Sequence, residues 1–321
     1  MKSVGIDVSK LFFDVALLSG DEKYITDRFS NDEIGFKEFD TWISSQEALE
    51  AHFCMEATGS YSVNLAKFLY SSGYTVSVEN AVKIKGFSKS LLLRAKNDRI
   101  DAKLIAHYCL KIKPLPWQPA SENREKLSSM THRLRTLKET KVQESNRLEK
   151  TSPYEIQQQI EAHIKFIDEQ ISALMKMIKS LISSDFLLKT QHRLLTSIPG
   201  IGEIVSATLL AEIEFKNYKQ ARQVASHAGL TPRERQSGSS VRYKSHISRM
   251  GNREIRKVLY MPVLCAKKHN PIIQEFWERL EKKGKPGKVI AVASMRKLLH
   301  IAVGVLKTNT EFTSAGFKLR G

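Results

Sequence analysis

The sequence has few cysteines and no long apolar run, and both shortages narrow the class of protein. Its three cysteines, Cys54, Cys109 and Cys265, are widely spaced and odd in number, without the short spacing of a metal site. They predict reduced thiols in the cytoplasm. No apolar run approaches the roughly 20 residues that a membrane helix needs, and the chain opens on a strand-like run in place of a signal peptide. We expect no membrane partner.

Acidic residues are also in short supply. The 321 residues include 51 Lys and Arg against 34 Asp and Glu, a formal net charge of +17. Such an excess indicates a polyanionic partner, and nucleic acid is the first choice. The length is enough for two or three domains with their own cores.

The first 113 residues alternate between strand and helix patterns. Period-two runs predict strands, and apolar residues at helical spacing predict helices. The predicted strands cover residues 4–8, 12–18, 23–29, 51–57 and 74–78, and the predicted helices cover 32–44, 60–72, 82–92 and 99–110. Three strands followed by strand–helix units indicate a mixed sheet with helices outside, an α/β fold of the ribonuclease H-like (RuvC-like) arrangement.

Four carboxylates fall where such a fold would gather them. Asp7 lies in the first strand, Glu56 ends a middle strand, and Asp98 and Asp101 are one turn apart in a late helix. Carboxylates placed in this way can hold Mg²⁺ (or Mn²⁺), which activates a nucleophile and steadies a leaving oxygen. The alternative is that Asp7 and Glu56 are ordinary acids at strand ends, and that Asp98 and Asp101 belong to a solvated helix face of mixed charge. Asp14 is left out, because the pattern does not assign it to a face.

A proline-rich stretch ends this first domain. Pro114, Pro116 and Pro119 break the helix pattern. Two long helical patterns follow, the second starting near Pro153 with Ser152 as its N-cap. Its apolar residues repeat at spacings of four and three, at Ile160, Ile164, Ile167, Ile171, Leu174, Ile178 and Leu181. Residues 114–185 therefore predict a linker and a coiled-coil helical hairpin, packed on itself or on a second copy.

A mainly α domain is predicted over residues 186–307, followed by a tail over 308–321. It opens on a turn with Gly200 and Gly202 ahead of a helix, which resembles a helix-hairpin-helix element. Glycines in such a turn let backbone N–H groups approach a phosphate. The alternative is a tight interhelical turn with no ligand.

The same domain contains a basic stretch with a serine at a glycine-flanked turn. Residues 233–257 include eight Lys or Arg against two Glu. A serine there could attack a phosphodiester while arginines neutralise the charge at phosphorus. From composition alone, a flexible Ser-Gly loop beside a phosphate-binding face is the better interpretation. The candidate nucleic-acid contacts are Arg233, Arg235, Arg242, Lys244, Arg249 and Arg253.

Together these motifs resemble the DEDD/serine transposases of bacterial mobile elements, the insertion-sequence one-ten family of RNA-guided recombinases. The N-terminal RuvC-like part resembles it at residues 5–10, 56–59 and 98–102. The C-terminal transposase part does so at residues 198–202, 228–232, 237–238 and 251–252.

The resemblance implies several features of mechanism and assembly. Asp7, Glu56, Asp98 and Asp101 would form a metal-assisted quartet, and a catalytic serine placed at Ser237 would link covalently to DNA; nearby Ser239 and Ser240 leave that choice open. It further implies donor and target DNA, a structured guide (bridge) RNA, a homodimer or homotetramer, and a nucleoid-associated cytoplasmic location.

Two other functions stay open at this point. A Holliday-junction endonuclease would keep the quartet but use metal-activated water, leaving the serine incidental. A non-catalytic nucleic-acid-binding scaffold would need only the basic residues.

Overall fold

The computed structural model describes residues 2–19, 23–91, 98–233, 236–237, 241–242, 246–247 and 250–314. The chain divides into two compact units, Met1–Pro119 and Ala120–Gly321, each of which is described by itself.

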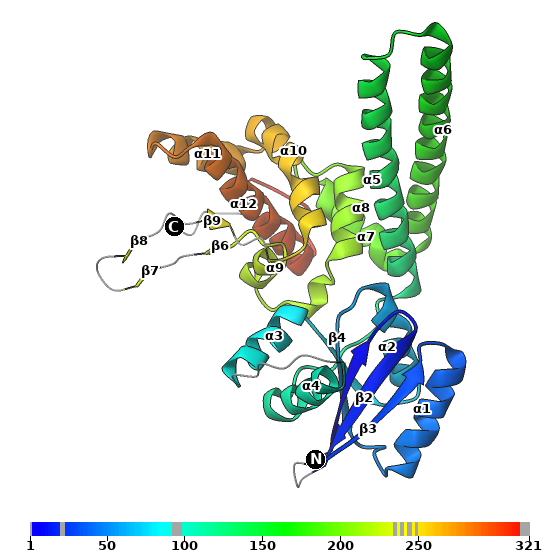
Figure 1. The fold of residues 1–321 in the computed structure, drawn as a ribbon. Coiled ribbons are helices and arrows are strands. Elements are labelled where there is room, and N and C mark those ends of the chain that lie inside the picture. The colour runs from blue at the N-terminus through cyan, green and yellow to red at the C-terminus, as the bar shows by residue number, and fades with distance from the viewer. Residues whose placement is uncertain are drawn as a thin grey trace. The chain divides into compact units, whose positions relative to one another are not determined.

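The first unit is a five-stranded mixed sheet with helices on both faces (Figure 1). Its strands are β1 (Ser3–Val8), β2 (Phe12–Leu18), β3 (Tyr24–Ser30), β4 (His52–Glu56) and β5 (Thr75–Glu79). Its helices are α1 (Glu33–Ser45), α2 (Ser60–Ser71), α3 (Ala81–Ser90) and α4 (Asp98–Ile112). The sheet order is β3-β2-β1-β4-β5; β1 pairs antiparallel with β2 and parallel with β4. The predicted mixed sheet with outer helices is confirmed and is consistent with a ribonuclease H-like domain.

The alternation of side chains along the strands sorts this unit into two layers. On one face, phenylalanines such as Phe13, Phe39 and Phe53 form an aromatic core under α1 and α2. On the other face, Ala16 and Cys54 are buried under α4. The carboxylates of interest lie on this second face, at its carboxyl edge.

The proline-rich stretch belongs to the first unit, so the division falls after Pro119 and not after residue 113. The backbone N–H of Trp117 donates to the Val76 carbonyl at 2.7 Å, and the Ser77 hydroxyl donates to the Leu115 carbonyl at 2.8 Å. These two bonds attach the stretch to β5, which is an edge strand of the sheet.

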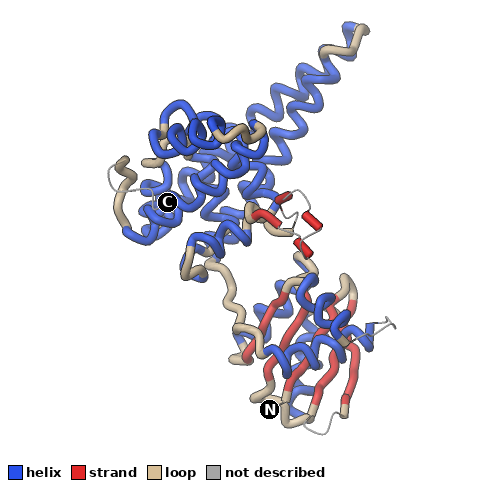
Figure 2. The backbone as a smooth tube through the Cα atoms, turned by 90° about the vertical axis from the view of Figure 1, so that its left-hand side faces the viewer, coloured by secondary structure: helices blue, strands red, loops and turns tan. Residues whose placement is uncertain are grey.

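The second unit begins with two long antiparallel helices, α5 (Glu122–Leu148) and α6 (Tyr154–Ser184) (Figures 1 and 2). Lys141 of α5 pairs with Asp168 of α6 at 2.6 Å, and Ile178 packs in the same core cluster as Leu134. All seven apolar residues of the predicted seam are buried or half-buried. The helix starts at Tyr154 with Pro153 as its N-cap and no side-chain cap, so the Ser152 cap was wrong.

The remainder of this unit is a helical bundle with a small β ribbon. Its helices are α7 (Phe186–Thr196), α8 (Glu203–Glu212), the 3₁₀ turn η1 (Phe215–Asn217), α9 (Ala221–His227), α10 (Arg253–His269), α11 (Pro271–Lys282) and α12 (Gly287–Thr308). Its short strands are β6 (Pro232–Arg233), β7 (Gln236–Ser237), β8 (Val241–Arg242) and β9 (His246–Ile247).

Helix α12 is a core element of this bundle. Among the described residues, it is the one helix long and apolar enough to cross a membrane, which corrects the expectation that no stretch would qualify. Residues such as Leu298, Leu299 and Ala302 are fully buried against neighbouring helices. The helix itself is expected from the sequence, but Arg296 and Lys297 interrupt its apolar run and hide how apolar it is on average.

Candidate active site

A row of acidic residues crosses four strands of the sheet. Asp14 of β2 lies directly opposite Asp7 of β1, and Glu56 of β4 lies opposite Glu79 of β5. The β1–β4 pairing, with Ile6 beside Met55, sets Asp7 next to Glu56 in the register. Partners in register share a face, and this face carries α3 and α4. The strand pairing therefore places Asp7 and Glu56 at one edge of the sheet, and their role as metal ligands stays a prediction.

Helix α4 supplies the other predicted pair. The Ser3 hydroxyl donates to the Ala106 carbonyl at 3.0 Å, whereas a Cβ at Gly5 would lie 2.1 Å from the Ala102 oxygen. A later residue of β1 thus approaches an earlier residue of α4, which means that the strand and the helix run antiparallel. The first turn of α4, with Asp98 and Asp101, is consequently directed toward the end of β1 that carries Asp7.

Two cations from the protein neutralise the flanks of the row. The Arg28 guanidinium donates to both Asp14 oxygens, at 3.1 and 2.8 Å, and Asp14 is only 5% exposed. At the other flank, Lys83 of α3 pairs with Glu79 at 2.7 Å. The charges of Asp14 and Glu79 are thus balanced within the unit by Arg28 and Lys83.

Sequence reasoning passed over Asp14, and strand arithmetic could have found it. In every β1–β2 partner pair the two residue numbers sum to 21. The pair nearest the connection is Val8 with Phe13, and the next is Asp7 with Asp14. A tight connection at Ser9, whose N–H donates to the Phe12 carbonyl at 2.9 Å, determines that register.

The donor set suits a hard divalent cation by its chemistry. Asp7, Glu56 and Asp101 offer carboxylate oxygens, the ligands that Mg²⁺ and Mn²⁺ prefer. Among the side chains that the structure describes, no group of three or more His, Cys, Asp or Glu could hold a metal ion. The Asp98 side chain lies outside the described set, and the quartet remains a prediction.

In the second unit, Ser237 lies on a hairpin. Ser237 pairs with Val241 and Gln236 with Arg242, while Arg233 pairs with His246 further down the ribbon. The side chains of Ser237, Arg233 and Arg242 are not among those described. Ser239, Ser240, Arg235, Lys244 and Arg249 lie outside the described residues.

The two ends of this ribbon cross at a pair of glycines. Gly251 has φ +117°, and a Cβ there would lie 2.5 Å from the Gly229 amide nitrogen. The Asn252 N–H donates to the His227 carbonyl at 2.7 Å, and the Asn252 side chain caps α10. This contact fixes the place where the ribbon that carries Ser237 joins the helical bundle. Arg253, the first residue of α10, is exposed beside it.

The two glycines of the predicted helix-hairpin-helix turn differ in their surroundings. Gly200 has φ +103° and packs on α10, where a Cβ would lie 2.6 Å from the Ala266 methyl. A Cβ at Gly202 would meet no atom within 4 Å, and Gly202 precedes α8 without a side-chain cap. Packing accounts for Gly200, whereas Gly202 leaves open backbone N–H groups that suit an anion.

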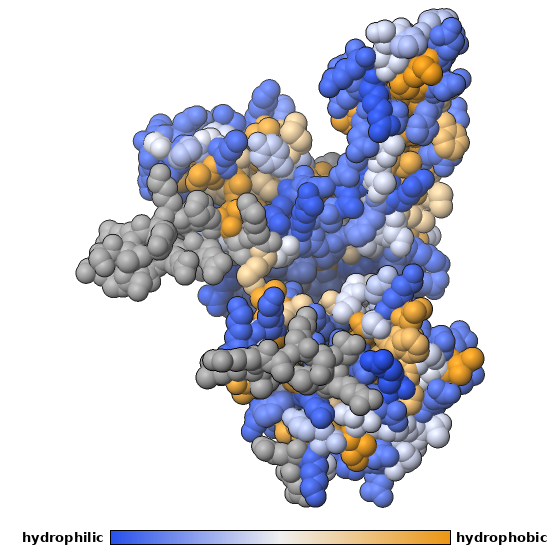
Figure 3. Space-filling model, viewed as in Figure 1, coloured by the Kyte–Doolittle hydropathy of each residue, from blue (hydrophilic) through white to orange (hydrophobic). Residues whose placement is uncertain are grey.

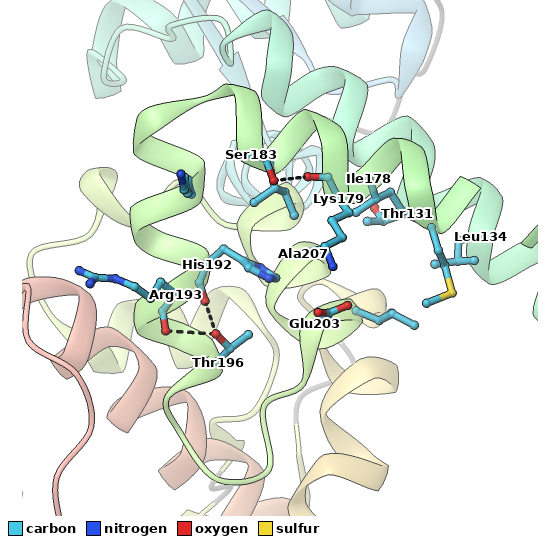
Figure 4. A pocket seen from close by; sticks show the side chains of 14 residues that line it. Thr131, Leu134, Ile178, Lys179, Ser183, His192, Arg193, Thr196, Glu203 and Ala207 are labelled. Carbon is cyan, nitrogen blue, oxygen red and sulfur yellow. Dashed lines mark hydrogen bonds between the residues drawn. The ribbon is translucent and has the colours of Figure 1, made fainter. Parts of the chain in front are cut away.

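A pocket of about 430 Å³ opens beside this turn, between α5, α6, α7 and α8 (Figure 4). Its floor includes Leu134 and Ile178, and the side chains of His192 and Glu203 extend toward it. Burial lowers the pKa of His192 from its ordinary value, against the opposing effect of Glu203.

Comparisons with known proteins identify the family. A DEDD transposase family of IS110 elements matches residues 4–151, and the family described as "Transposase IS116/IS110/IS902 family" matches residues 192–278. The pilin gene-inverting proteins of Moraxella bovis and Moraxella lacunata are each 35% identical over 313 residues, 96% of this chain and 97% of theirs. The chain belongs to the IS110 family of transposases.

A further relative is more distant. An uncharacterised IS110 insertion-element protein of Streptomyces coelicolor is 26% identical over 149 residues, 46% of this chain and 36% of that protein.

The family matches and the pilin gene-inverting relatives together show that this transposase is a DNA recombination enzyme. The first family match contains the four predicted carboxylates, and the second contains Gly200, Gly202 and Ser237.

Proposed function

We propose that this transposase cleaves and rejoins DNA through Ser237, with Mg²⁺ or Mn²⁺ held by Asp7, Glu56, Asp98 and Asp101. The observation that carries the proposal is the carboxylate row at the carboxyl edge of β1 and β4, with the first turn of α4 directed toward it. A bound divalent cation supplies Lewis acidity for the charge that develops on the phosphate.

The chain's own residues perform the rest of the chemistry. The Ser237 oxygen forms a bond to phosphorus as the bond to one sugar oxygen breaks, and the serine proton ends on that departing oxygen. Arg233, Arg235 and Arg242 clamp the phosphate. Rejoining reverses the step, with a sugar hydroxyl attacking the phosphoserine.

We further propose the partners that the family resemblance implies. Donor and target DNA are the substrates, a structured bridge RNA selects them, and the enzyme acts as a homodimer or homotetramer in the cytoplasm at the nucleoid. The net charge of +17 supports binding of both nucleic acids.

Trapping of a protein–DNA adduct tests the chemistry. Wild-type transposase with Mg²⁺, co-purified RNA and cleavable DNA should give a gel-shifted adduct that survives denaturation, and Ser237→Ala should give none. Asp7→Asn and addition of EDTA should each abolish both cleavage and adduct.

The alternatives give other results. Cleavage without any adduct in the wild type would establish the water-activating nuclease and refute the serine mechanism. If the wild type gave neither cleavage nor adduct, and Asp7→Asn and Ser237→Ala bound nucleic acid as well as the wild type does, only the scaffold would remain. Ser239→Ala and Ser240→Ala serve as matched controls, and loss of the adduct in one of them alone would move the nucleophile there.

A further inference from the structure

A second groove of the Ala120–Gly321 unit lies at the root of the ribbon that carries Ser237. Its volume is about 560 Å³, within the range of roughly 300–1,000 Å³ that ligand sites occupy. One side is formed by α11 and α12, and the other by Leu230 and Pro232 at the start of the ribbon and Ile247 at its end. Figure 3 shows apolar surface over α11 and α12 amid hydrophilic surroundings.

The groove combines an apolar floor with positive charge. Phe276, Val289 and Val292 supply apolar surface, and Val289 is 51% exposed. Lys288, Arg296, Lys297 and His300 line it from one stripe of α12, and the described lining contains no Asp or Glu. An apolar surface bordered by Lys288, Arg296 and Lys297 complements a ligand that joins a flat apolar group to an anion.

Among the described residues, no salt bridge neutralises the cations of this stripe, although Glu275 acts on Lys297 from nearby. Within the described part of the chain, Lys288, Arg296 and Lys297 make no ion pair, and His300 has a buried Nε2 without a hydrogen-bond partner. Burial lowers the pKa of Lys297, as does Arg279, while Glu275 opposes this. Burial and then Arg296 and Lys297 lower the pKa of His300. Gathering like charges in a half-buried groove is unfavourable until an anion enters.

We propose that this groove holds one unpaired nucleotide of the DNA strand beside the phosphate that Ser237 attacks. The base lies on the apolar floor against Phe276, because aromatic rings stack on bases of any sequence. The adjoining phosphates lie at Arg296 and Lys297. DNA is favoured over RNA because the groove adjoins the ribbon with Ser237. The inference rests on the proposed function in placing the scissile phosphate there.

Photo-crosslinking of the full chain tests the assignment. Single-stranded DNA oligonucleotides, each with one 5-iodouracil, are irradiated with the transposase, and the crosslinked peptides are sequenced. We expect crosslinks at Phe276 or His300. Phe276→Leu, which keeps the apolar volume, should weaken oligonucleotide binding about tenfold, in line with the loss of one base stack.

The charges are tested by salt dependence. Arg296→Gln together with Lys297→Gln should lower the slope of log K against log salt by about 0.7 for each lost phosphate contact on a single strand. The matched control is Lys282→Gln with Lys283→Gln, which removes the same charge from exposed residues outside the groove. Equal slopes for the two double variants would overturn the assignment.

Two further outcomes are decisive. Crosslinks confined to other segments would overturn the groove, and so would crosslinking by 5-iodouracil RNA but not by DNA, which would assign it to RNA. The adduct assay separates the two proposals. A groove crosslink without any serine adduct would refute Ser237 as the nucleophile and support the nucleotide site in the groove. A serine adduct without a groove crosslink would support the nucleophile and refute the nucleotide site.

Discussion

Gly5→Ala should separate helix α4 from strand β1. The new Cβ would lie 2.1 Å from the Ala102 carbonyl oxygen and 2.2 Å from the Ala106 amide nitrogen. Ordinary contact begins at 3.4 Å, so α4 must retreat by 1.3 Å, the difference between 3.4 and 2.1 Å. Both atoms belong to the helix backbone, and no side chain can rotate away. Overpacking of this kind costs about 3 kcal/mol, the upper part of its usual range.

The displacement should affect activity more than stability. Asp98 and Asp101 move with α4, and a misplacement of about 1 Å can cost roughly 100-fold in rate. We expect Gly5→Ala to lower the Tm of the Met1–Pro119 unit by roughly 10 °C and to reduce metal-dependent DNA cleavage about 100-fold. Differential scanning calorimetry and a gel-based cleavage assay measure the two effects.

Gly86→Ala is the matched control. Gly86 lies in α3, and a Cβ there would meet no atom within 4 Å. Replacing a helical glycine by alanine should stabilise by about 0.5–1 kcal/mol. If Gly5→Ala kept the wild-type Tm and cleavage rate, the close packing of α4 on β1 would not be what holds the acids together.

Three other perturbations have expected outcomes. Arg28→Gln leaves Asp14 buried without its partner and should cost about 1–2 kcal/mol in urea unfolding, since Arg28 itself is half exposed. Gly251→Ala places a Cβ against Gly229 and should cost about 3 kcal/mol and impair DNA cleavage. Burial lowers the pKa of His227, so the unfolded chain takes up a proton first as pH falls below about 6.5. The stability of the second unit, measured by calorimetry, should therefore be full above that pH and decline below it.

Each of these has a control of the same type. Lys85→Gln removes an exposed charge from the first unit and should leave urea unfolding unchanged. Gly284→Ala introduces the strain of a positive φ, +67°, without a clash, and should cost only about 1 kcal/mol. His227→Gln should make the decline with pH shallower without removing it, because burial also lowers the pKa of His192 and of His300 in the same unit. His269→Gln, at an exposed position, should leave the decline unchanged. An unchanged profile in His227→Gln would exclude His227 as its source.

Local pattern was sufficient for the order of elements in the first unit. The strand around Asp7 and the helix predicted over 99–110 follow from side-chain periodicity, which is a property of neighbouring residues. The end of the strand at Glu56 follows from the apolar run before it and the glycine turn after it. The separation of a sheet unit from a helical unit follows in the same way from composition.

Only the tertiary structure decided which residues meet. Strand register set Asp14 beside Asp7, and the crossing of α4 over Gly5 directed its first turn to the sheet edge. Close backbone approach explains Gly200 and Gly251, which sequence reasoning could read only as turns. The cationic groove joins residues near 230 to residues near 300 along the chain. Such contacts depend on the free energy of packing between distant segments, and no local pattern encodes it.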